Sequence, residues 1–228
     1  MSDGDYRPYP GLDPFLEEHL PGVAIKVVTR FRPLIEGMMD DGDVHRQALF
    51  LHVGLACPEL GFPWFTTVYT ASFGRQPITS WEYPYNGIAR GKNRISGRTG
   101  QLSRVIRVAR PLELVDGDTE FWGNWKFGRI LVANSGVKPW FDMAFSSSIG
   151  SLMVAELEQI LFTVYGMTAE EAGLVTYDGT TLTIFETRSL AERIIATETG
   201  PDDFDDLGWS RGFGFWKWLK SLLTRTRN

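Results

Sequence analysis

The chain has 228 residues, of which 43% are hydrophobic and 13% aromatic, a composition typical of a folded globular protein and not of a disordered one. The net charge of −5 argues against a general nucleic-acid binder, which would be basic, and the single cysteine, Cys57, excludes an intramolecular disulfide. We expect a soluble, cytoplasmic protein with one domain over residues 1–199, followed by a linker and tail over residues 200–228.

The first third of the chain is expected to form a short helix followed by strands. Residues 14–20 follow a helix N-cap, and a proline stands at the first helical position. Residues 23–31, VAIKVVTRF, are β-branched and predict a strand, and Pro33 would interrupt a helix running through them. Residues 45–57 are apolar enough to be buried, and residues 62–73, FPWFTTVYTASF, predict another strand.

Acidic residues and histidines in this region are the best candidates for metal ligands. Asp40, Asp41 and Asp43 precede His45 and His52, but their spacing matches neither the zinc motif H-E-x-x-H nor an acidic calcium loop. We therefore expect no metal and no cofactor, and we interpret the histidines as core or surface residues.

The most concentrated charge lies in residues 90–110, RGKNRISGRTGQLSRVIRVAR, which hold seven Arg or Lys residues and no acid. The pattern predicts a Gly-punctuated loop and then a short basic helix with Leu102, Val105, Ile106 and Ala109 on its apolar face, with a strand as the alternative. The candidate anion-binding or partner-binding residues are Arg90, Lys92, Arg94, Arg98, Arg104 and Arg107.

Two more specific hypotheses for this stretch are disfavoured. Residues 91–99 read G-x5-G-R-T, which resembles the nucleotide-binding P-loop G-x4-G-K-[ST] but is one residue longer, has Arg98 in place of Lys and follows no hydrophobic strand. Trp81, Tyr83 and Tyr85 precede it and could stack on single-stranded nucleic acid or a nucleotide base. Packing on the core explains the same three rings, and we favour that interpretation.

The second half begins with predicted strands over residues 111–115 and 120–132. Pro139 then opens a long amphipathic core helix over residues 141–165. Ser146, Ser147, Ser148 and Gly150 approach the G-x-S-x-G motif of serine hydrolases, but the first Gly is missing and every histidine lies upstream. We interpret these small residues as helix-packing positions.

The remaining segments complete an α+β pattern. Thr168 and Glu171 predict a capped helix start, Asp178-Gly179 predicts a hairpin between residues 174–177 and 180–185, and residues 188–197 predict a short helix. Strands therefore come first, without βαβ alternation. We expect a mostly antiparallel sheet packed against one long helix in the C-terminal half, with a short amphipathic helix at the C-terminus.

The last residues combine opposite charges. Residues 200–206, GPDDFDD, hold four acids and predict a linker. The tail beyond it is basic and rich in Trp, and one face of its predicted helix carries Phe215, Trp218, Leu219 and Leu222. This face could dock on its own domain, in a partner's groove or at a membrane surface, with the membrane ranked below a partner.

Two functions compete. The first is a non-enzymatic interaction or assembly protein that contacts a protein partner, or another copy of itself, through the basic stretch and the tail. The second is an enzyme or ligand-binding domain for a phosphorylated or other anionic small molecule, bound by Arg90, Lys92, Arg94 and Arg98. Because no stretch completes a catalytic motif, we favour the first.

Overall fold

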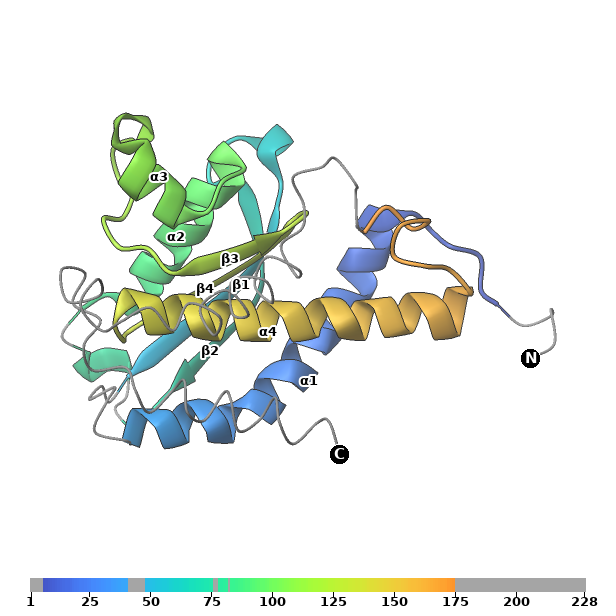
Figure 1. Ribbon diagram of the computed structural model, residues 1–228, viewed down its shortest axis with the longest axis horizontal. Helices are drawn as coiled ribbons and strands as arrows, with labels where there is room; N and C mark the ends of the chain where they lie inside the picture. The colour runs from blue at the N-terminus through green and yellow to red at the C-terminus, as the bar shows by residue number, and fades with distance from the viewer. Residues whose placement is uncertain (1–5, 41–47, 76–77, 82, 175–228) are drawn as a thin grey trace, which may run out of the picture.

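The computed structural model describes residues 6–40, 48–75, 78–81 and 83–174 (Figure 1). Their helices are α1 (Leu12–Asp40), α2 (Tyr85–Thr99), α3 (Ser103–Ala109) and α4 (Pro139–Ile160). The strands are β1 (Leu49–Ala56), β2 (Phe65–Phe73), β3 (Asn124–Phe127) and β4 (Ile130–Ser135). Short 3-10 turns occur at η1 (Pro58–Leu60), η2 (Ile78–Ser80) and η3 (Pro111–Glu113), and a π turn, η4 (Leu161–Tyr165), extends α4.

All strand pairs in the sheet are antiparallel, in the order β2-β1-β4-β3. Helices α1 and α4 pack on one face of this sheet, while α2 packs on β1 and β4 from the other face (Figure 1). Because successive residues of a strand point to opposite faces, this sandwich buries β1 along its whole length. The α+β class and the long helix in the C-terminal half are confirmed.

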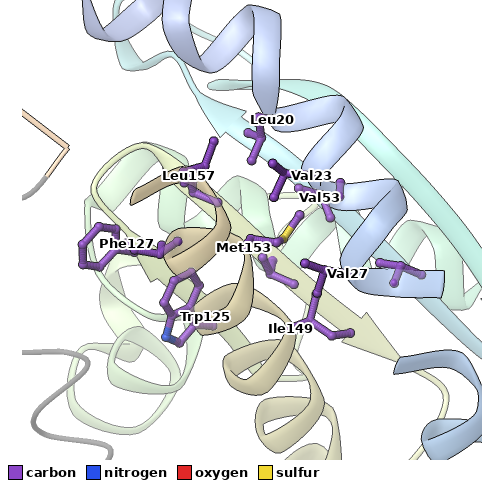
Figure 2. Packing of buried hydrophobic residues seen from close by; sticks show 14 of the residues in the cluster. Leu20, Val23, Val27, Val53, Trp125, Phe127, Ile149, Met153 and Leu157 are labelled. Atoms are coloured by element: carbon purple, nitrogen blue, oxygen red, sulfur yellow. The ribbon is translucent and has the colours of Figure 1, made fainter. Parts of the chain in front are cut away.

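The main core lies between the sheet and the pair α1 and α4. Figure 2 shows side chains of both helices gathered at Val53 of β1, with the aromatic rings of β3 against α4. On α4 the buried residues Ile149, Met153 and Leu157 recur every four positions, which places them on one helical face. Fully burying side chains of this size contributes roughly 1.5–3 kcal/mol each.

Helix α1 corrects two expectations, because the short helix at residues 14–20 and the strand at residues 23–31 form one continuous helix with Pro33 inside it. Its buried residues follow helical spacing toward α4, and they include Leu20, Val23, Ala24, Val27 and Val28. Lys26 and Arg30 lie on the flank of α1, and both bind Glu156 of α4. Packing against α4 thus outweighs the strand preference of the β-branched residues.

Two further secondary-structure predictions are confirmed, and three differ from the structure. β2 lies within the strand predicted at residues 62–73, and α4 with η4 covers the helix predicted at residues 141–165. The predicted strand at residues 120–132 is instead β3 and the start of β4, which reverse direction at the exposed Gly128. Residues 111–115 form η3 and a loop, not a strand, and the Gly-punctuated loop after residue 90 is part of α2.

The segments after residue 174 lie outside the described residues. They include the predicted hairpin at Asp178-Gly179, the helix at residues 188–197, the acidic linker and the tail. Within the described residues, none of the helices combines the length and the apolar character that crossing a membrane requires.

Candidate interaction surface

Helix α2 carries four of the candidate cations, and its glycines determine how closely it packs. A Cβ atom added to Gly97 would lie 2.6 Å from the backbone oxygen of Trp64, and one added to Gly91 would lie 3.2 Å from the side chain of Thr119. Glycine therefore lets α2 approach both the segment before β2 and the loop before β3. This close packing turns the cations of α2 toward different neighbours.

Lys92 is fully buried, and it links α2 to the opposite side of the sheet. Its Nζ donates to Asp142 Oδ2 of α4 at 2.7 Å and to the backbone oxygen of Asn134 in β4 at 2.6 Å. Burial raises the pKa of Asp142 to about 7 and lowers the pKa of Lys92, while the attraction between the two charges opposes both shifts. The predicted ligand-binding residue Lys92 therefore holds the fold together and does not reach solvent.

A second buried polar group joins α2 to β1. Asn93 donates through Nδ2 to Nδ1 of His52 at 2.9 Å, and Nε2 of His52 lies 3.0 Å from Oγ1 of Thr67. Burial, and then the positive charge of Arg90, lower the pKa of His52 to about 3. His52 is therefore neutral at physiological pH and serves as an interior hydrogen-bonding residue.

Ser146, from the segment that approaches the hydrolase motif, is also an interior residue. Its Oγ donates to the backbone oxygen of Asp142 at 2.7 Å and accepts from Nδ2 of Asn134 at 3.0 Å. The neighbouring small residue Gly150 packs under Trp125, because an added Cβ would lie 2.1 Å from the indole ring. These contacts support the interpretation of this segment as a packing surface of α4.

Arg94 and Arg98 hold the loop between η3 and β3 against α2. Arg94 Nε donates to Oδ1 of Asp118 at 3.1 Å, and Arg98 Nη2 donates to its Oδ2 at 2.6 Å. The Asp118 side chain is only 2% exposed between them. The guanidinium of Arg94 also lies over the ring of Phe62, and that of Arg98 over the ring of Trp64. Both arginines are therefore structural tethers of the loop.

Helix α3 has the opposite character, because only one of its sides is buried. Ser103 and Ile106 point inward, and Ser103 N donates to Oδ1 of the buried Asn124 at 3.0 Å. The sequence pattern placed Val105 and Ala109 on the buried face with Ile106, but both are exposed. Figure 1 shows α3 lying beyond α2, on the side of the sheet away from α1.

The outward side of α3 and η3 combines large aliphatic side chains with arginines. The exposed fraction is 70% for Val108 and 99% for Leu112. Arg104 lies over the ring of Trp122 at 5.0 Å, and Arg110 pairs with Glu113 at 3.3 Å. We name this set the α3–η3 surface, and it consists of Arg104, Val105, Arg107, Val108, Arg110 and Leu112.

A groove with a volume of about 360 Å³ opens between η1, the end of α2 and the turn from β3 to β4. Of the four cations in the anionic-ligand hypothesis, Arg98 alone lines it, together with Lys126 and Arg129. Arg129 is already bound to Asp13 and Glu59, as Arg98 is to Asp118. Since carboxylates neutralise these guanidinium groups, the groove gives weak support to an anion site.

Among the predicted site residues, the structure thus separates buried or tethered cations from exposed ones. Arg104 and Arg107 share the α3–η3 surface, and Arg90 is exposed on α2. The tail residues Phe215, Trp218, Leu219 and Leu222 lie outside the described residues. Comparisons of the chain with protein-family models, with curated proteins and with solved structures gave no match.

Proposed function

We propose that this protein is a non-enzymatic interaction protein whose α3–η3 surface contacts a protein partner. The observation that carries the proposal is the exposure of Val105, Val108 and Leu112 within eight residues of chain. Exposed apolar groups that lie together are typical of interaction sites, whereas single ones are ordinary. Arginine, which alternates with them here, is also enriched in interfaces.

The chemistry of the α3–η3 surface indicates the partner's composition. Guanidinium groups bind carboxylates through paired hydrogen bonds, so the arginines favour an acidic partner. Val108 and Leu112 require apolar side chains opposite them, and burying an exposed leucine fully stabilises a complex by roughly 1.5–3 kcal/mol. The expected partner segment therefore combines Asp or Glu with Leu or Phe.

The interior polar residues support the non-enzymatic proposal. Lys92, Asp142, His52 and Ser146 are of the types that perform acid–base or nucleophilic chemistry, but all four are buried and bonded to other interior groups. A catalytic group has to come within hydrogen-bonding reach of its substrate. Buried groups whose bonds join α2 to the sheet and α4 are better explained as fold-stabilising contacts.

A library of displayed random peptides tests the proposal without requiring that the natural partner be identified first. The full chain should enrich peptides that combine acidic and apolar residues. The variant Val108→Ser/Leu112→Ser should bind the enriched peptides at least tenfold more weakly, with an unchanged circular dichroism spectrum. Ile25→Ser is the control, because Ile25 is 52% exposed on α1, across the sheet from α3. Failure to enrich peptides, or equal binding by the surface variant, would refute the proposal.

A charge variant tests the arginines separately. Arg104→Glu/Arg107→Glu should weaken the same peptides at least tenfold and leave the melting temperature within a few degrees, because both side chains are exposed. Arg94→Glu/Arg98→Glu is the contrasting pair, which should lower the melting temperature because it opposes the buried Asp118. Unchanged peptide binding by Arg104→Glu/Arg107→Glu would show that these arginines take no part in peptide binding.

A further inference from the structure

The chain itself contains a segment with the composition expected of the partner. Residues 202–207, DDFDDL, place four aspartates around Phe204 and end in Leu207. We propose that this acidic segment binds the α3–η3 surface of its own chain. The inference rests on the proposed function, because it names the first occupant of the same surface.

Charge is the first argument for this occupant. Arg104, Arg107 and Arg110 follow one another at intervals of three residues, so neighbouring guanidinium groups repel each other on α3. Arg110 is offset by Glu113, and no carboxylate among the described residues forms a salt bridge with Arg107. Four aspartates within five residues also repel one another. Contact between the arginines and the aspartates reduces the repulsion within each set.

The apolar residues match as well. Phe204 lies in the middle of the acidic segment and Leu207 at its end, while Val108 and Leu112 are the most exposed aliphatic residues of the α3–η3 surface. Seating the phenyl ring and the leucine on these side chains removes apolar surface from water on both sides. A purely acidic segment would lack this second contribution, which also fixes where the segment binds.

The length of chain after the described residues allows the contact. The described part of the chain ends at Leu174, beside the turn from β3 to β4. There the backbone oxygen of Leu174 lies 3.8 Å from a Cβ built on Gly128. Residues 175–201, which number 27, span at most roughly 90 Å when fully extended, and roughly 35 Å with the hairpin and helix predicted within them, which is close to the diameter of a domain of this size. Because both binding groups belong to one chain, the occupancy of the contact does not depend on protein concentration.

Occupancy by the acidic segment has a consequence for the proposed function. An external acidic partner has to displace the segment, so its apparent affinity is lower than the affinity of an unoccupied surface. Neutralising the segment should therefore strengthen peptide binding, whereas neutralising carboxylates elsewhere should not.

Hydrogen exchange measured by mass spectrometry on the full chain tests the contact. Replacing the four aspartates with asparagine and Phe204 with serine should speed exchange of the amides at residues 104–112 at least threefold. The control variant Glu17→Gln/Glu170→Gln neutralises exposed carboxylates elsewhere and should leave these amides unchanged. Equal exchange in the wild type and the segment variant would overturn the inference.

A charge exchange makes the test specific for the pairing. Arg104→Asp/Arg107→Asp should speed exchange on α3, and adding Asp203→Arg/Asp205→Arg should restore at least half of the protection. No restoration, or protection that disappears on tenfold dilution, would rule out an intramolecular contact. If the segment variant changes nothing while displayed peptides still bind the α3–η3 surface, this inference fails and the proposed function stands. If no peptide binds either, both fail.

Discussion

Replacing Lys92 with methionine is expected to lower the free energy of unfolding by about 3–5 kcal/mol. Methionine fills a similar volume but leaves the carboxyl of Asp142, whose side chain is only 4% exposed, buried without its cation. Removing one partner of a buried ion pair costs about this much, because the remaining carboxyl cannot regain its hydration and, without the attraction of Lys92, its pKa rises further and it takes up a proton. The backbone oxygen of Asn134 also loses a donor at 2.6 Å.

The double variant Lys92→Met/Asp142→Leu shows whether charge is the cause. Replacing both partners with apolar residues removes the unpaired buried carboxyl, so the double variant should be more stable than Lys92→Met alone. It should remain about 1–2 kcal/mol below the wild type, because the backbone groups of Asn134 and Val137 lose their bonds to the pair. The sign of the coupling is the decisive quantity, and it is independent of errors in either absolute value.

Urea unfolding followed by circular dichroism measures these differences at pH 7. Arg107→Met is the matched control, because it removes an exposed cation and should change stability by less than about 0.5 kcal/mol. A loss below about 1 kcal/mol for Lys92→Met, or a double variant as unstable as the sum of its single variants, would refute the reasoning. It would show that Lys92 is not enclosed with Asp142.

Three further predictions concern packing, pH and salt. Gly150→Ala should destabilise the protein by about 1–3 kcal/mol in urea unfolding, because the new Cβ would overlap the ring of Trp125. Gly22→Ala on α1 has open space around the new Cβ and should stabilise the protein by up to about 1 kcal/mol. Equal effects of the two substitutions would contradict this prediction. The pKa of His52 falls from 6.5 to about 3 on folding. The unfolded chain therefore binds a proton on His52 below pH 6.5, whereas the folded chain does not bind it until about pH 3. Between pH 7 and pH 4.5 the wild type should therefore lose about 2.5 kcal/mol of stability relative to His52→Gln, since the raised pKa of Asp142 acts in the opposite direction but equally in both proteins; parallel curves would exclude His52 as the cause. Acidic peptides should bind the α3–η3 surface at least threefold more weakly at 0.5 M than at 0.05 M NaCl, as fluorescence anisotropy can measure, and salt-independent binding would exclude an electrostatic contact.

The basic stretch illustrates how far sequence reasoning reaches toward the candidate site. The sequence identifies the cations but not which of them are buried or paired and which are exposed. Lys92, Arg94 and Arg98 recur along α2 and are alike in their local sequence, yet Lys92 contacts Asp142, and the two arginines contact Asp118. Those partners lie 50, 24 and 20 residues farther along the chain. No local pattern reports a contact of that range.

The exposure of the apolar residues on α3 does not follow from the sequence, for a related reason. Val105 and Ile106 are adjacent and equally apolar, and the helical pattern assigned both to the buried face. α3 has only seven residues, so its orientation is fixed by the hydrogen bonds of Ser103 to Asn124 and not by a long apolar stripe. A short helix with one buried turn leaves the rest of its apolar residues in solvent.

Local patterns predict the α+β class, the strand β2 and the long helix α4, because alternation and helical periodicity are local properties that burial then reinforces. Long-range packing, in contrast, makes residues 23–31 part of α1 and the glycine-rich residues after Arg90 part of α2. In the first case packing against α4 overrides β-branched preference. In the second, glycine permits contacts with Trp64 and Thr119 that a loop would not need. Which cations of α2 reach solvent follows from the second packing.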